Sequence, residues 1–175
     1  MKPIGKCILV IALSTLFALP IPMTAYSSEG HSHEEPQTDM DEFFKGASLE
    51  NGSKIYFVGR TISGKPVERT GGPHWLYMHG GGCANCHGDN GQGGIVPMMC
   101  AKSSPPITMK ALTSGPHKHN GTEEHHTPYT IETIRQALEK SVNPDLKPFS
   151  PCMPQWFLSD TDFRDLLYKL KELDK

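Results

Sequence analysis

Two cysteines three positions apart, followed at once by a histidine, most constrain this chain of 175 residues: Cys83, Cys86 and His87. On one helical turn the two sulfurs can reach both vinyl groups of a porphyrin, and the next imidazole can meet the iron. A redox dithiol, a zinc half-site and a structural disulfide are the alternatives for a bare cysteine pair. Because the histidine is in register, the motif predicts one covalently bound haem c, attached through Cys83 and Cys86, with His87 as an axial ligand of the iron.

The first 25 residues have the pattern of a secretory signal peptide. Two lysines precede a mostly apolar run from residue 7 to residue 19, and a proline-bearing stretch leads to Ala25, near which we expect cleavage. An uncleaved membrane anchor is the alternative, although two prolines interrupt the apolar run.

Export to the periplasm agrees with the motif, since covalent haem attachment in bacteria is completed outside the cytoplasmic membrane. Cleavage would remove two lysines and no acidic residue, which takes the formal net charge from -2 to about -4. A mildly acidic chain of this kind is not expected to bind nucleic acid. After cleavage we expect no stable membrane insertion.

Residues 26–47 are polar and acidic, so we expect a disordered tail before a folded domain at residues 48–175. His31 and His33 in this tail, with two neighbouring glutamates, could hold a divalent metal loosely, although a solvated linker is the simpler interpretation. A second histidine-rich run contains His117, His119, His125 and His126. It could bind zinc, copper or nickel, or form a solvated surface insertion.

Three segments of the domain have helical signals. Residues 48–59 follow a serine cap and end at a glycine, residues 130–142 repeat apolar side chains every three or four positions, and a leucine stripe follows Ser159 toward the C-terminus. The segments 60–82 and 101–128 are expected to be loops. Since no alternation typical of strands is found, we predict a helical domain with long loop insertions.

Met153 is the candidate for the sixth coordination position of the iron. It precedes a proline that fixes the backbone, in irregular chain just before the last helix. A thioether favours ferrous over ferric iron and so raises the reduction potential relative to a second imidazole. A methionine packed in the core is the alternative. Met98 and Met99 are expected to fill gaps in an apolar core, with soft-metal binding as their alternative.

These residues together resemble the class I, or mono-haem, c-type cytochromes over about residues 48–173. The matching positions are Gly52, Tyr56, residues 83–88, the helix at 130–142, Met153, Pro154, Trp156 and residues 159–162. The resemblance implies a small all-α cytochrome c fold, with four to five helices around the haem and long loop insertions. Its N-terminal and C-terminal helices cross at Gly52, with His87 and Met153 on opposite faces of the iron. It also implies periplasmic one-electron transfer through transient contacts with periplasmic or membrane redox proteins.

Two features leave alternatives open. Lys169 stands where the family usually has a tyrosine, which leaves the detail of the helix crossing undecided. Cys100 and Cys152 are an even pair of remaining cysteines in an oxidising compartment. They could form a disulfide between the loop after the haem motif and the loop that holds Met153, or stay as free thiols.

The alternative function is a haem-based ligand sensor, or a copper- or zinc-handling protein, in which Met153 dissociates and leaves the sixth position to a small molecule or another side chain. We expect no enzyme, since no sequence pattern supplies the acid–base residue that a haem peroxidase needs.

Overall fold

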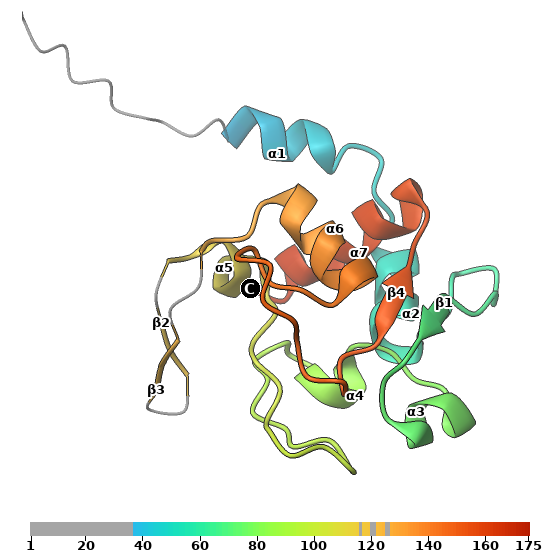
Figure 1. The fold of residues 1–175 in the computed structure, drawn as a ribbon. Helices are drawn as coiled ribbons and strands as arrows, with labels where there is room; N and C mark the ends of the chain where they lie inside the picture. The colour runs from blue at the N-terminus through green and yellow to red at the C-terminus, as the bar shows by residue number, and fades with distance from the viewer. Residues whose placement is uncertain (1–36, 116, 120–121, 125–126) are drawn as a thin grey trace, which may run out of the picture. The chain divides into compact units, whose positions relative to one another are not determined.

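The computed structural model describes residues 37–115, 117–119, 122–124 and 127–175 (Figure 1). The expected signal peptide, His31 and His33 lie outside the described residues, as do His125 and His126. In chain order the elements are α1 (Gln37–Phe43), α2 (Leu49–Val58), β1 (Glu68–Thr70), α3 (His74–His79), α4 (Ala84–His87), α5 (Met109–Thr113), β2 (His117–His119), β3 (Thr122–Glu124), α6 (Ile131–Lys140), β4 (Gln155–Phe157) and α7 (Asp160–Glu172). Within this part of the chain, no helix is long and apolar enough to cross a membrane.

The helices α2 and α7 cross at Gly52. Ser48 caps α2, because its hydroxyl accepts a hydrogen bond from the Asn51 amide at 3.1 Å, and Gly59 follows the helix in the left-handed region at φ 65°. A Cβ atom added to Gly52 would lie 2.0 Å from the carbonyl oxygen of Asp165 on α7. The two backbones can therefore approach this closely because residue 52 has no side chain. The expected helix at residues 48–59 and its crossing point are both observed.

Lys169 of α7 is compatible with this crossing. Its Cβ would lie 3.1 Å from a Cβ atom on Gly52, and its ammonium lies 5.2 Å from the ring centre of Phe57 on α2. The aliphatic stem can pack along the crossing while the charge interacts with an aromatic face. The lysine is thus accommodated at the crossing without separating the helices.

A buried polar network joins α2 to α7. Asn51 Nδ2 donates to Asp165 Oδ2 at 2.8 Å and to Asp162 Oδ1 at 2.9 Å, while Asn51 Oδ1 accepts from the Ile62 amide at 2.7 Å. Asp165 is 2% exposed, and its Oδ1 accepts from the Ser48 amide at 2.7 Å. Each polar atom of the Asn51 and Asp165 side chains has a partner, so the buried carboxylate is satisfied.

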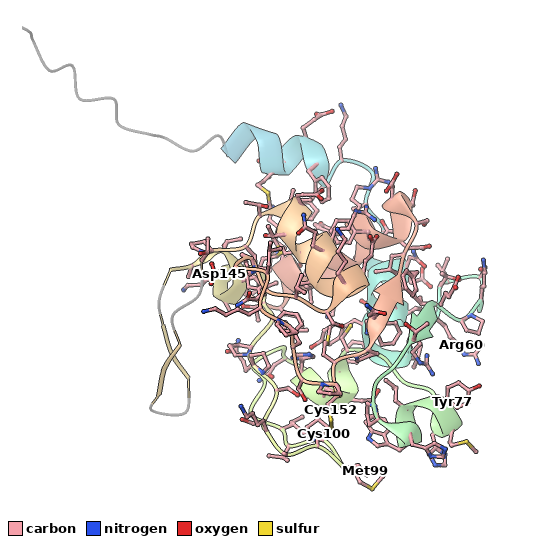
Figure 2. All side chains as sticks on the ribbon, in the orientation of Figure 1. Arg60, Tyr77, Met99, Cys100, Asp145 and Cys152 are labelled. Carbon is pink, nitrogen blue, oxygen red and sulfur yellow. A yellow bond between two sulfur atoms is a disulfide. The ribbon has the colours of Figure 1, made fainter. Side chains whose placement is uncertain are left out.

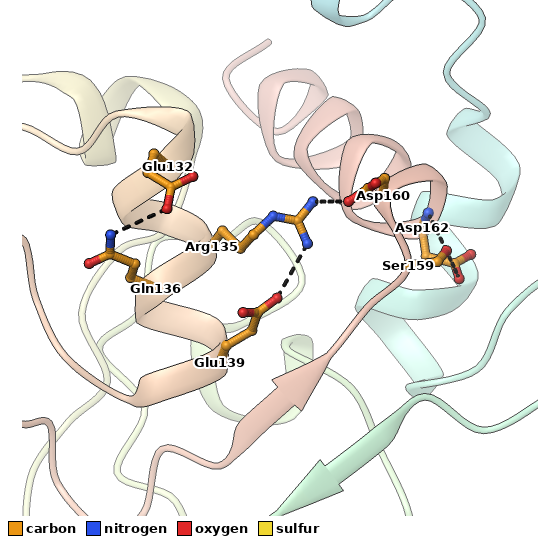
Figure 3. Close-up of polar contacts among 7 residues, drawn as sticks. All are labelled: Glu132, Arg135, Gln136, Glu139, Ser159, Asp160 and Asp162. Atoms are coloured by element: carbon orange, nitrogen blue, oxygen red, sulfur yellow. Dashed lines mark hydrogen bonds and ion pairs between the residues drawn. The ribbon is translucent and has the colours of Figure 1, made fainter.

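The last helix, α7, begins where the sequence predicts. The Ser159 hydroxyl accepts from the Asp162 amide at 3.2 Å and donates to the carboxylate of the same residue at 2.7 Å (Figure 3). Arg135 of α6 extends to Asp160 Oδ1 at 2.8 Å, and its guanidinium lies 4.1 Å from the ring centre of Phe163. Because the Asp160 side chain is exposed, packing on the ring holds α6 against α7 more than the ion pair does.

The helix α6 ends at Lys140, two residues before the predicted end. Ser141 adopts the left-handed region at φ 52° and ψ 46°, and Val142 pairs with Pro148 in an isolated bridge across the following turn. The apolar Val142 suggested a longer helix, but its backbone belongs to the turn. This early end directs the chain toward Met153.

Short strands correct the expectation of a chain without β-structure. β1 pairs antiparallel with β4, with Arg69 opposite Trp156, and β2 pairs antiparallel with β3. The helices α3 and α5 also lie in segments that were expected to be loops. Strands of three residues are too short to show an alternating pattern, and β1 and β4 come from distant parts of the sequence, so no local signal marks them. Whether the helices together form the cytochrome c fold stays a prediction.

The N-terminal boundary of the domain needs a correction. The expected tail at residues 26–47 contains α1, and the buried Phe44 follows that helix. The Phe44 ring lies 5.1 Å from the ring of Phe43 and 5.6 Å from that of Tyr168 on α7, centre to centre. Two adjacent aromatic residues thus anchor a segment whose average composition is polar, and composition alone obscures them.

Candidate functional site

The cysteine motif forms the single helical turn that haem attachment requires. The His87 amide donates to the Cys83 carbonyl at 2.9 Å, and the Cys86 amide donates to the same carbonyl at 3.1 Å. A Cβ atom added to Gly82, just before this turn, would lie 2.3 Å from the Tyr56 carbonyl oxygen at the end of α2. The motif therefore starts in direct contact with α2, one of the two crossing helices.

Tyr56 connects the other end of this turn to α2. It is fully buried, and its hydroxyl donates to the Gly88 carbonyl at 2.5 Å. Burial raises the pKa of the Tyr56 hydroxyl, so this group remains a protonated donor. The residues on both sides of the Cys83–His87 turn are thus fixed by the same helix.

His87 is a buried imidazole whose orientation is fixed by one hydrogen bond, as is typical of a histidine that binds a metal. Its side chain is 7% exposed, and Nδ1 lies 2.8 Å from the Pro105 carbonyl oxygen, which makes Nδ1–H the donor and leaves Nε2 with its lone pair. Burial lowers the pKa of the imidazole, although the hydrogen bond to Pro105 opposes that shift. A neutral histidine held through one nitrogen by a carbonyl can offer its other nitrogen to a metal.

A cavity of about 470 Å³ brings the predicted site residues together, and its size falls within the range of cofactor pockets, roughly 300–1,000 Å³. Cys83, Cys86, His87 and Met153 all line it. Apolar side chains form much of the remaining wall, including Leu76, Ile107, Leu112, Ile134, Leu166 and Leu170. Such a wall, with two thiols, one neutral imidazole and one thioether, fits a flat apolar group that carries an iron.

Met153 reaches the cavity from the loop before β4. Its amide donates to the Ser150 carbonyl at 2.9 Å, and its carbonyl accepts from the Ser141 hydroxyl at 3.2 Å. Pro154 is buried, and its Cβ would lie 3.0 Å from a Cβ atom on Gly72. The proline therefore packs closely against the chain that follows β1, and this contact fixes the backbone after the methionine.

Cys100 and Cys152 form a disulfide with a Cα–Cα distance of 6.0 Å (Figure 2). Of the two alternatives left open by the sequence, the structure thus has the disulfide and not the free thiols. The expectation that Met98 and Met99 fill gaps in a core is wrong, because these side chains are 64% and 74% exposed. They lie in an exposed loop beside Cys100, and the Met98 carbonyl accepts from Trp75 Nε1 at 3.0 Å.

Cys83 and Cys86 remain free thiols. Burial raises the pKa of the Cys83 thiol to about 12, and burial also raises the pKa of the Cys86 thiol. Both groups are therefore protonated at neutral pH, whereas a redox dithiol depends on a cysteine whose pKa is lowered.

Within the described ranges, no group of three or more His, Cys, Asp and Glu side chains could hold a metal ion.

Pro105 supplies the carbonyl that orients His87, and it was not among the residues predicted from the sequence. The only available signal was the Pro105-Pro106 pair, which was interpreted as ordinary loop sequence. The group that acts is a backbone carbonyl, an acceptor that every residue has, so the residue type does not mark this role.

The chain was compared with family models, curated proteins and solved structures. No family model matches the chain, and neither a curated protein nor a solved structure matches it.

Proposed function

We propose that the protein is an exported one-electron carrier with one covalently bound haem c, held by Cys83 and Cys86 and ligated by His87 and Met153. The observation that carries this proposal is the shared cavity. The three residues of the Cys83–His87 motif line one apolar space together with Met153, which was selected from the sequence for a separate chemical reason and comes from a distant part of the chain.

The haem would supply the electron chemistry, and the residues of this chain attach, orient and enclose it. Cys83 and Cys86 lie one turn apart and would form the two thioether bonds. The Pro105 carbonyl fixes the tautomer and orientation of His87, while the turn around Ser150 brings Met153 to the same cavity. Ligands held by the backbone in this way limit rearrangement when an electron is gained or lost.

Export and electron exchange complete the proposal. A disulfide is expected to persist in an oxidising compartment such as the periplasm, which supports export through the signal peptide expected at residues 1–25. Electrons would pass to periplasmic or membrane redox proteins in small transient contacts. The mildly acidic net charge favours partners with basic docking surfaces.

Visible spectroscopy of the haem-loaded protein tests this proposal. We expect the weak far-red band of methionine bound to ferric iron in the parent, no reaction of the ferrous parent with carbon monoxide, and loss of the band in Met153→Ala. Met98→Ala is the matched control, because this methionine is exposed and does not line the cavity.

The same spectra identify the alternative function. A parent protein that lacks the methionine band, or that binds carbon monoxide readily, has an open or differently filled sixth position. That result would favour the sensor or metal-handling function over electron transfer.

A further inference from the structure

We propose that the Cys100–Cys152 disulfide is a positioning group for Met153, and that it keeps the thioether in place as the sixth ligand. This inference rests on the proposed function, since it concerns how the same site retains that ligand. It follows from one segment of the chain, residues 91–107, which contacts both ligand-bearing regions. We call residues 91–107 the bridging segment.

The base of the bridging segment is hydrogen-bonded to the region of His87. The Gly93 amide donates to the His87 carbonyl at 2.8 Å, and the Pro105 carbonyl accepts from the imidazole of the same residue at 2.8 Å. The two arms of the segment are also bonded to each other, since the Gly94 amide donates to the Ser104 carbonyl at 2.8 Å. The base is therefore fixed with respect to the first candidate ligand.

The tip of the bridging segment reaches the second candidate ligand. Cys100 lies at this tip, beside the exposed Met98 and Met99, and it is bonded to Cys152, the residue directly before Met153 (Figure 2). A single piece of chain thus orients His87 at its base and is covalently bonded next to Met153 at its tip.

The noncovalent contacts of the Met153 backbone are modest. Its amide is bonded within its own turn, to Ser150, and its carbonyl accepts one neutral hydrogen bond from Ser141. Neutral hydrogen bonds of this kind are individually weak. On the C-terminal side Pro154 is buried, but on the N-terminal side an exposed turn precedes Cys152. The disulfide is the strongest restraint on that side.

Opening the disulfide would therefore loosen the methionine and leave the histidine in place. Reduction by a dithiol breaks the S–S bond, transfers two electrons and two protons to form the Cys100 and Cys152 thiols, and converts the dithiol to its own disulfide. Once the turn that carries Cys152 is no longer bonded to the tip, the effective concentration of the Met153 thioether at the iron decreases. The hydrogen bond from His87 to Pro105 does not depend on the tip.

The test measures how fast imidazole displaces methionine from the ferric, haem-loaded protein. It compares the parent with Cys100→Ser/Cys152→Ser, and with parent protein whose disulfide has been reduced and alkylated before the iron is reoxidised. We expect the displacement rate to rise at least about tenfold in both altered forms, with a lower reduction potential. If the double variant does not fold, the alkylated parent still gives the answer.

Two further measurements separate positioning from general stability. Phe44→Ala removes an aromatic contact to Tyr168 at the terminal helix, and Phe44 does not line the cavity, so this variant should lose stability without faster displacement. Amide hydrogen exchange of Met153, which needs no property of the iron, should be faster in Cys100→Ser/Cys152→Ser than in the parent.

The possible failures are distinguishable. A parent with the methionine band, whose displacement rate changes by less than about twofold in both altered forms, overturns the positioning role alone and keeps the proposed function. A parent without the band overturns both. An equal rate increase in Phe44→Ala assigns the effect to general stability and also overturns the positioning role.

Discussion

The α2–α7 crossing and the bridging segment hold their parts together in opposite ways. At the crossing, a direct backbone contact at Gly52 and the fully paired Asn51–Asp165 network act on the same short stretch of chain. The bridging segment is bonded at its base to the backbone and the imidazole of His87. Its exposed tip is attached by the Cys100–Cys152 bond and by one hydrogen bond from Trp75 Nε1 to the Met98 carbonyl. The first region has several overlapping restraints, whereas the second depends on few.

This difference assigns separate roles to the two regions. The motif at Cys83–His87 is fixed to α2 through Tyr56, so it shares the rigidity of the crossing. Met153 belongs to a loop that shares the weaker restraint of the bridging segment. Damage to the crossing should therefore unfold the domain as a whole, while damage near the loop should displace Met153, the proposed sixth ligand, at a smaller cost in stability.

Gly52→Ala should produce the largest effect on the crossing. The new Cβ would lie 2.0 Å from the Asp165 carbonyl oxygen, so the helices must separate, and we expect the free energy of unfolding to decrease by about 3 kcal/mol. The measurement is urea denaturation of the haem-loaded protein. Lys54→Ala, at an exposed position of the same helix, should change the free energy of unfolding by less than about 0.5 kcal/mol.

The direction of the change in the free energy of unfolding decides the Gly52 test. In a helix without this contact, alanine is more favourable than glycine by about 1 kcal/mol. A stabilised Gly52→Ala variant would therefore show that the two backbones are not in contact at this residue.

Asn51→Ala should have a smaller effect, because it removes polar partners without forcing the helices apart. It leaves the Asp165 carboxylate and the Ile62 amide without their Asn51 contacts, and we expect the free energy of unfolding to decrease by about 2 kcal/mol. Denaturant titration measures this loss, and the methionine band should persist in the folded variant. The control is Asn90→Ala, whose amide oxygen accepts one exposed hydrogen bond from Gln92. An equal loss in both variants would contradict a special role for the buried network.

At the α2–α7 crossing, the sequence predicted the helices better than the contacts between them. The caps at Ser48 and Ser159 and the glycine at the crossing are local signals, and the structure has each of them in place. The Asn51–Asp165 network was not predicted, since its partners come from opposite ends of the domain and neither residue type has a pattern that marks such a pairing. Local chemistry predicted the helices, but not the polar contacts between them.

In the candidate site too, the sequence marked residues with a distinctive chemistry but not the distant residues that support them. Cys83, Cys86 and His87 could be selected because covalent haem attachment would restrict both residue type and spacing, and Met153 because it precedes a proline in irregular chain before the last helix. Pro105 was missed because it acts through a backbone carbonyl, which every residue has. The terminal segment at Phe43–Phe44 was also missed, because two aromatic residues barely change the average composition of a polar tail.

Leu146→Gly should give the smallest effect and has the opposite sign. Leu146 lies in the exposed turn before Met153, with φ at 60° and 70% of its surface exposed, so its side chain loses little contact and its backbone carries left-handed strain. We expect glycine to raise the free energy of unfolding by about 0.5 kcal/mol, with an unchanged methionine band. The control is Leu49→Gly, at a partly exposed position in the first turn of α2, where the same substitution should lower the free energy by about 0.5–1 kcal/mol. Thermal and urea denaturation of both variants measure whether each free energy of unfolding increases or decreases. A destabilised Leu146→Gly protein would mean that the loop is held by packing of this leucine, and the contrast with the crossing would then be smaller than the backbone contacts indicate.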